Sequence, residues 1–193
     1  MRGLLILATV PLLAAVGLPK QTQTPLSSIR GYRNWTLVTP QPVDMAPAIA
    51  TSCMGPSLFD SDPNPHAPKL FKVYVNPIGK AAMTSEGKEI FPVGSMIVKE
   101  KFTGLPLNFR SRPPLPKDAK PVLLTAMVKR EKGFDAPNGD WEYIVLTGDG
   151  ARKTTDGLSH CTSCHAGQKK NDFVFGDYGS IQHGRFRRSK SPL

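Results

Sequence analysis

Two cysteines and a histidine stand close together near the end of this 193-residue chain, as Cys161, Cys164 and His165 in a C-x-x-C-H pattern. At this spacing two thiols bond covalently to the vinyl groups of a haem, and the adjacent imidazole coordinates its iron. The two-residue gap brings both sulfurs to one side of a turn, and the histidine reaches the metal from the same side. The pattern therefore predicts a covalently attached haem c, with His165 as the proximal iron ligand.

Paired cysteines at this spacing also occur in zinc sites and in thiol redox pairs, and His160 could supply a further nitrogen. A closed zinc site usually uses a second ligand pair, whereas the only other cysteine is Cys53. A thioredoxin-like pair follows an early strand and opens a helix of a βαβ unit, which a late position does not fit. Haem is therefore favoured, and Cys53 is left as an odd thiol that is buried, reactive or intermolecular.

The N-terminus begins with Arg2 and an uncharged run over residues 3–18 that is rich in Leu, Ala and Val. This run is short for a membrane span and suits the apolar part of a secretory signal, with an uncleaved anchor as the alternative. The remaining length suits one domain with a real core. The sequence predicts a signal peptide over 1–19, a linker over 20–28, a haem domain over 29–178 and a basic tail over 179–193. We expect an exported, for instance periplasmic, protein.

The formal net charge is +10, and part of the excess lies in Arg185, Arg187, Arg188 and Lys190, with no acid nearby. A basic tail can bind nucleic acid, an anionic membrane surface or an acidic redox partner, although most such tails are only solvated. For the exported protein that we expect, nucleic acid is the partner that fits least. No nucleic-acid function is predicted.

Hydrophobic patterning predicts four strands between the leader and the cysteine pair. They span residues 70–76, 95–102, 122–128 and 141–147. A short helix is expected over 77–83, where Pro77 suits a first helical position, and a haem-bearing helix over 158–169. The Pro-rich stretches 40–68 and 103–120 predict irregular structure.

The second axial position of the iron separates the known kinds of c-type cytochrome. An electron-transfer cytochrome c carries its motif early and a methionine ligand downstream, but no methionine follows His165, and only His183 could close the site from downstream. A helical-bundle cytochrome c′ carries its motif late, yet the upstream chain here is strand-like. A five-coordinate iron with an open face is favoured, which suits binding or turnover of a small molecule. Met54 and His66 are weaker upstream alternatives.

Six short runs occur in an order that resembles a known family. They are YRxW at 32–35, KVYVNP at 72–77, GSMIVKE at 94–100, GDW at 139–141, CTSCH at 161–165 and DFVF at 172–175. Over residues 29–178 the chain resembles the cytochrome P-460 family. The resemblance implies an α+β, β-rich fold, in which an antiparallel sheet of about four to five strands packs on the distal face of a c-type haem. Short helices would include the haem-attachment segment.

The resemblance also implies roles for two residues on the distal side. In members that oxidise hydroxylamine a lysine is bonded to the porphyrin, and the matching residue is Lys99. Strand alternation places Lys99 on the face of the apolar Ile97, although Lys101 shares that face and an ordinary solvated lysine is the alternative. The distal glutamate of those members aligns with Thr125, a poor base at neutral pH, while Glu100 points to the opposite face. This departure argues against efficient hydroxylamine oxidation.

Three functions follow as expectations. The first is an exported mono-haem protein that binds or oxidises hydroxylamine or nitric oxide and passes electrons to a partner cytochrome. The second is a non-catalytic gas-binding protein that resembles the cytochrome c′-β branch. The third is an electron-transfer cytochrome with His183, Met54 or Met127 as sixth ligand and a basic surface for docking. Because family members are often dimers, a homodimer is also expected.

Overall fold

The computed structural model describes residues 23–39, 42–44, 69–85, 89–103, 115–116, 118–152 and 158–176. Within them lies one six-stranded antiparallel sheet of order β1-β3-β4-β5-β6, with β2 pairing with β3 as well. The strands are β1 (Thr36–Leu37), β2 (Val43–Asp44), β3 (Lys69–Val75), β4 (Met96–Thr103), β5 (Leu123–Lys129) and β6 (Trp141–Thr147). The helices are α2 (Lys80–Thr84), α3 (Ser159–Ala166) and the 3-10 turns η1 (Leu26–Ser28), η2 (Tyr32–Asn34), η3 (Ala136–Asn138) and η4 (Lys169–Asn171).

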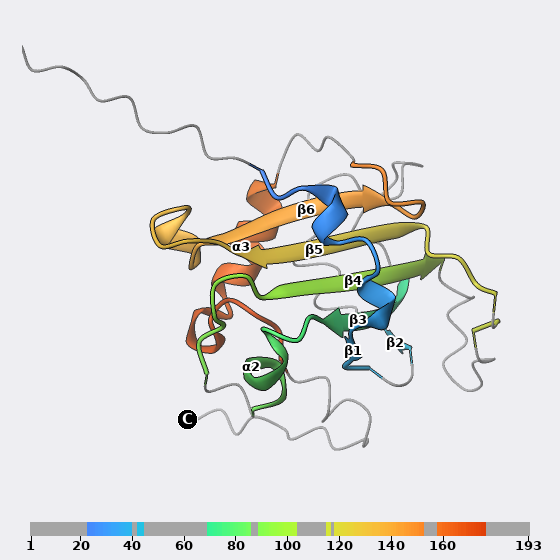
Figure 1. Ribbon diagram of the computed structural model, residues 1–193, viewed down its shortest axis with the longest axis horizontal. Helices are drawn as coiled ribbons and strands as arrows, with labels where there is room; N and C mark the ends of the chain where they lie inside the picture. Colours follow the sequence, from blue (N-terminus) through green and yellow to red (C-terminus); the bar gives the residue numbers. More distant parts are fainter. Residues whose placement is uncertain are drawn as a thin grey trace, which may run out of the picture.

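The four predicted strands are confirmed as β3 to β6, which follow one another as an antiparallel meander (Figure 1). The predicted α+β, β-rich fold class is confirmed as well. The bounds shift by about a residue, and the short strands β1 and β2 were not predicted. Helix α3, which was expected as the haem-bearing helix over 158–169, is shorter, because the chain turns at Gly167 and continues as η4. The helix expected over 77–83 is observed as a turn followed by α2.

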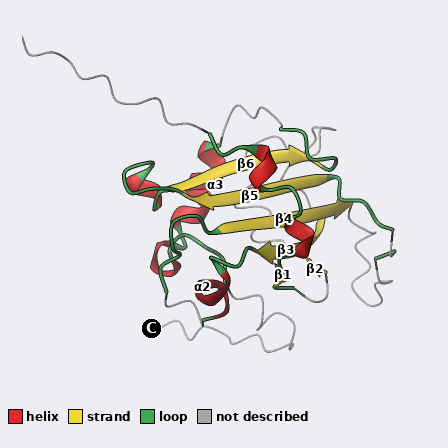
Figure 2. Ribbon diagram, viewed as in Figure 1, coloured by secondary structure: helices red, strands yellow, loops and turns green. Residues whose placement is uncertain are grey.

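Each face of the sheet is covered by a different part of the chain (Figure 2). One face, called the α3 face below, carries Val73, Ile97 and Met127 and packs against α2, α3 and the segment after η4. The opposite face carries Val98 and Ala126 and is covered by the turns η1 and η2. Because β5 and β6 are buried on both faces, their sequences are nearly continuous apolar runs.

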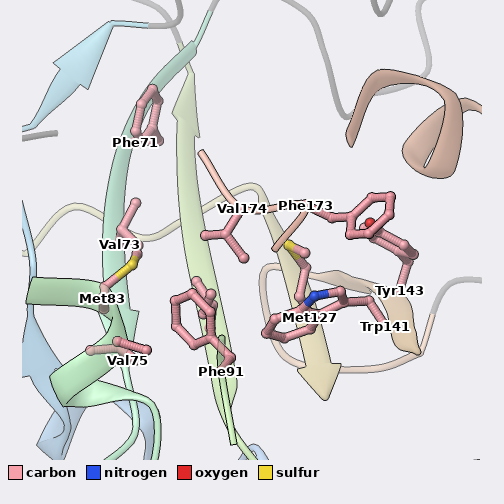
Figure 3. Packing of buried hydrophobic residues seen from close by; sticks show 12 residues of the cluster. Phe71, Val73, Val75, Met83, Phe91, Met127, Trp141, Tyr143, Phe173 and Val174 are labelled. Atoms are coloured by element: carbon pink, nitrogen blue, oxygen red, sulfur yellow. The ribbon is translucent and has the colours of Figure 1, made fainter. Parts of the chain in front are cut away.

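The core of the α3 face is a cluster of twelve buried residues. They are Phe71, Val73, Val75, Ala82, Met83, Phe91, Ile97, Met127, Trp141, Tyr143, Phe173 and Val174. Figure 3 shows the three side chains of β3 pointing to the same side of their strand, as alternation requires. The cluster joins the sheet to the segment that follows the cysteine motif, so the strands and the attachment helix form one folded unit.

On the opposite face, a buried carboxylate links the turn η2 to the sheet. Glu100 accepts hydrogen bonds from the Tyr32 hydroxyl at 2.5 Å, from Arg33 Nε at 2.6 Å and from the Tyr74 hydroxyl at 3.3 Å. Only 2% of Glu100 is exposed, and these donors satisfy its charge where water is excluded. Glu100 therefore lies on the face away from Lys99, as alternation predicted, and ties η2 to the sheet.

No helix within the described ranges is both long enough and apolar enough to cross a bilayer. Several predictions concern segments outside the described residues. These are the signal peptide, most of the linker, the basic tail, Cys53, Met54, His66 and His183. They stay predictions, as do the domain boundaries.

Candidate functional site

Helix α3 presents the cysteine motif to the sheet. Cys161 and His165 are four residues apart on a helix, so their side chains lie on the same side of it. The Cys161 thiol is free, and its side chain packs against the apolar cluster of the α3 face. Burial raises the pKa of this thiol, and the nearby charge of Lys101 acts against that rise. Cys164 is disulfide-bonded in the structure, so a thioether at Cys164 requires its reduction first.

His165 is held in the form that a metal ligand needs. Its ring packs between Tyr143 and Phe175, with ring centroids 5.1 Å and 5.0 Å away. Nδ1 lies 2.7 Å from the carbonyl oxygen of Phe173. Because a carbonyl can only accept, Nδ1 carries the proton and Nε2 keeps its lone pair. Burial lowers the pKa of His165 to about 4, so the imidazole is neutral at pH 7.

The two predicted distal residues face each other across neighbouring strands. Lys99 of β4 is directly opposite Thr125 of β5, and Val73 of β3 flanks Lys99 on its other side. Lys99 is half-buried, and its Nζ lies 4.6 Å from the centroid of the Phe71 ring. The positive charge of Lys99 also contributes to the low pKa of His165. The structure thus brings Lys99 and Thr125 to the α3 face, on which His165 packs.

Lys101 is the first functional candidate that the sequence did not single out. It lies two residues from Lys99 on the same face, and only 2% of it is exposed. Its charge affects both Cys161 and His165. Alternation placed Lys101 on this face, but alternation does not tell how fully a face is covered, so its burial could not be predicted.

Tyr143 is the second functional candidate that the sequence did not single out. It is buried beside His165, and its hydroxyl has no hydrogen-bond partner among the described residues. Burial raises the pKa of Tyr143, and the proximity of Cys161 acts in the same direction. A buried hydroxyl without a partner is unusual in a folded protein and indicates that a further group belongs here. The position of Tyr143 in β6 predicts its face, but not its contact with His165.

These observations fit a haem. A free thiol, a neutral imidazole with a fixed tautomer, a hydroxyl without a partner among the described residues and a cluster of buried apolar side chains occur on one face of the sheet. Within the described ranges, no group of three or more His, Cys, Asp or Glu side chains is placed so that it could hold a metal ion. The antiparallel sheet also lacks the βαβ unit of a thioredoxin-like site.

Of the residues predicted as a possible sixth iron ligand, the structure describes only Met127. Met127 is buried on the α3 face and lies opposite Tyr143 in the strand register, so it remains an alternative. Met54, His66 and His183 are outside the described residues.

Comparison with known proteins agrees with this site. No curated protein matches the chain. A family model described as Cytochrome P460 matches residues 29–176, a range that contains β1 to β6 and α3. Because the match covers well over half of the chain, the protein belongs to the cytochrome P460 family and is a c-type haem protein whose chemistry concerns small nitrogen species.

Proposed function

We propose that the protein is an exported mono-haem c protein that binds or oxidises small nitrogen species such as hydroxylamine or nitric oxide, with His165 as the only protein ligand of its iron. The observation that carries the proposal is the hydrogen bond from His165 Nδ1 to the Phe173 carbonyl, which leaves Nε2 ready for a metal. The bound haem would supply an iron that takes small ligands and exchanges electrons. Cys161 and Cys164 would hold its edge by thioether bonds.

Lys99 and Thr125 are proposed to act from the sheet. Lys99 would form a covalent bond to the porphyrin, and its half-buried position on the α3 face supports this role. The Thr125 hydroxyl would donate or accept a hydrogen bond with a bound ligand. It cannot serve as a base at neutral pH, and Glu100 cannot replace it because Glu100 lies on the opposite face, bonded to Tyr32. Binding, or slow oxidation, is therefore favoured over efficient turnover.

A second candidate function is electron transfer with Met127 as sixth ligand. The observation that favours it is the burial of Met127 on the α3 face, on which His165 packs. A thioether sulfur at the second axial position would exclude small ligands and raise the reduction potential of the iron. The two functions therefore differ in whether the iron has an open position.

The remaining proposals concern the setting of the protein. The apolar run 3–18 would direct export to the periplasm, a compartment that suits a c-type haem protein. A redox-partner cytochrome would accept electrons, and the basic surface would favour an acidic docking partner. The protein would act as a homodimer, in line with the frequent dimers of its family.

One preparation tests the proposal. The full chain is expressed with the c-haem maturation machinery, and its absorption spectrum is recorded before and after addition of nitric oxide. Hydroxylamine is then added with an electron acceptor. We expect a high-spin spectrum that changes with nitric oxide, and slow hydroxylamine turnover. Nitric oxide binding without any turnover supports the gas-binding form of the proposal. A low-spin spectrum that is indifferent to nitric oxide overturns it and favours electron transfer.

A further inference from the structure

The carbonyl that accepts the His165 hydrogen bond lies in an unusual stretch of backbone. Asp172 has φ 49° and Phe173 has φ 63°, so two consecutive residues with side chains adopt left-handed conformations. Such conformations are costly for residues other than glycine, because Cβ approaches a backbone oxygen. They persist only where the surrounding structure forces them.

Asp172 is held by three different segments of the chain. Its carboxylate accepts hydrogen bonds from Lys129 Nζ at 2.7 and 2.8 Å and from the Phe91 backbone N–H at 2.9 Å. Its backbone carbonyl accepts a hydrogen bond from Trp141 Nε1 at 2.8 Å. About a tenth of the Lys129 and Asp172 side chains is exposed, so this ion pair is shielded from water. Asp172 is thus bound through its carboxylate to β5 and to the segment before β4, and through its backbone carbonyl to β6.

Phe173 is held by packing. A Cβ atom added at Gly139 would lie 2.5 Å from the Phe173 ring, so the ring rests directly on the backbone of the β5–β6 hairpin. Gly139 itself has φ +70°, which also favours glycine at this position. In addition, the Phe173 N–H donates to the Gln168 carbonyl at 2.9 Å. The Phe173 carbonyl belongs to the peptide group that Phe173 shares with Val174, and the Val174 N–H donates to the Asn171 carbonyl at 3.0 Å. The Phe173 ring and these two amides therefore fix the backbone on both sides of Phe173.

The contacts of Asp172 and Phe173 together determine the position of the Phe173 carbonyl oxygen. This oxygen lies 2.7 Å from His165 Nδ1. When a histidine coordinates a metal through Nε2, a short hydrogen bond from its Nδ1–H fixes the orientation of the ring. The same hydrogen bond makes Nε2 a stronger electron donor to the metal. Stronger donation stabilises the oxidised metal and lowers its reduction potential.

We propose that Lys129 is a positioning residue for the haem iron: by pairing with Asp172 it holds the left-handed turn whose Phe173 carbonyl sets the donor strength of His165. The proposal rests on the proposed function in one respect, since it takes His165 as the iron ligand. Lys129 lies outside the C-x-x-C-H motif, and it would affect the iron only indirectly, through Asp172, the Phe173 carbonyl and His165. Lys129 Nζ also lies over the Trp141 ring, 5.1 Å from its centroid, so two contacts fix the position of the ammonium group.

The test compares haem-loaded variants. Lys129→Met removes the ammonium, and the double variant Lys129→Met with Asp172→Asn removes both charges, so that no buried charge is left unpaired if the single variant does not fold. Lys129→Arg keeps the charge, and Lys132→Met removes an exposed lysine nearby as a control. The readouts are the iron–histidine stretching band of the ferrous protein in resonance Raman spectra and the reduction potential.

We expect the stretching band to move to lower frequency and the potential to rise in both charge-removing variants. Lys129→Arg should restore both values toward those of the unsubstituted protein, and Lys132→Met should leave them unchanged. If folded variants without the Lys129 charge keep the original band and potential, the positioning role is overturned. If the unsubstituted protein shows no iron–histidine band, the proposed function itself fails, and the inference fails with it.

Discussion

Lys99 and Glu100 are neighbours in β4, yet they belong to two differently built surfaces. On the opposite face, the Glu100 carboxylate is surrounded by donors from Tyr32, Arg33 and Tyr74. On the α3 face, the Tyr143 hydroxyl has no partner among the described residues, although it is buried. One face is thus completed by hydrogen bonds within the chain. The other contains a polar group that the described chain does not satisfy.

The difference between the two faces indicates where a ligand belongs. A closed network such as that of Glu100 contributes stability, and the Glu100 carboxylate already has its hydrogen-bond donors within the chain. The α3 face instead combines a cluster of buried apolar side chains with the lone pair of His165 and the half-buried Lys99. We therefore expect substitutions on the α3 face to change chemistry, and those on the opposite face to change stability.

Thr125→Glu should produce the largest change. It places a carboxylate directly across from Lys99 on the α3 face, which provides the base that Thr125 lacks. A positioned general base contributes on the order of 10²- to 10⁴-fold in rate, so hydroxylamine oxidation should increase within that range. The measurement is steady-state turnover with an artificial electron acceptor. Thr125→Gln has nearly the same shape without the base and should stay near the original rate; an equal increase in both would contradict the assignment.

Glu100→Ala should give the largest loss of stability without altering the haem spectrum. The substitution leaves Tyr32, Tyr74 and Arg33 without their shared acceptor. Because Arg33 is largely exposed and can bond to water instead, the loss is about 3 kcal/mol in the free energy of unfolding, rather than the full cost of a broken buried pair. Chemical denaturation of the haem-loaded protein measures it. The exposed Glu89→Ala is the control, and a shifted haem spectrum in folded Glu100→Ala would break the division between the faces.

Lys99→Ala should show the reverse pattern. We expect a change within about 1 kcal/mol in unfolding free energy, since Lys99 is only half-buried, but complete loss of the lysine–porphyrin bond. Proteolysis of the unsubstituted protein should release a haem peptide that joins the 161–165 segment to the peptide containing Lys99. Lys72→Ala is the control, because Lys72 is a half-buried lysine of the neighbouring strand β3 and lies across from Glu100 on the opposite face. A haem peptide with the 161–165 segment alone, or a bond that survives in Lys99→Ala, contradicts the cross-link at Lys99.

Much of this division could be predicted from the sequence, because it depends on strand parity. Alternation in residues 95–102 was enough to separate Lys99 from Glu100, and the C-x-x-C-H spacing was enough to place Cys161 and His165 on one helix. The strand register that sets Lys99 against Thr125 depends on connection lengths, which parity does not determine.

Other parts of the site depend on contacts between distant segments. Tyr143 meets His165 only after the sheet and α3 have packed, and no local pattern predicts that meeting. The left-handed turn at Asp172 and Phe173 contains no glycine, so the sequence gives no sign of it. Two-residue strands such as β1 are too short to show the alternation of apolar and polar residues by which a strand is predicted. The covering of Lys101 likewise depends on what packs over the face, which alternation does not measure.

Tyr143→Phe should have the smallest effect, and its sign should differ between the haem-free and haem-loaded proteins. Without haem, the substitution removes a buried hydroxyl that has no described partner, so the unfolding free energy should increase by about 1 kcal/mol. If the haem-loaded protein gives that hydroxyl a hydrogen-bond partner, the same substitution should lower its stability by about 1 kcal/mol. Denaturation of both forms, followed by tryptophan fluorescence or circular dichroism, measures the two values. The buried Tyr74, whose hydroxyl already bonds to Glu100, supplies the control: Tyr74→Phe should destabilise both forms equally. A stabilising Tyr143→Phe in both forms would mean that the unpartnered hydroxyl does not mark the haem site, and the contrast between the two faces would then rest on Lys99 and His165 alone.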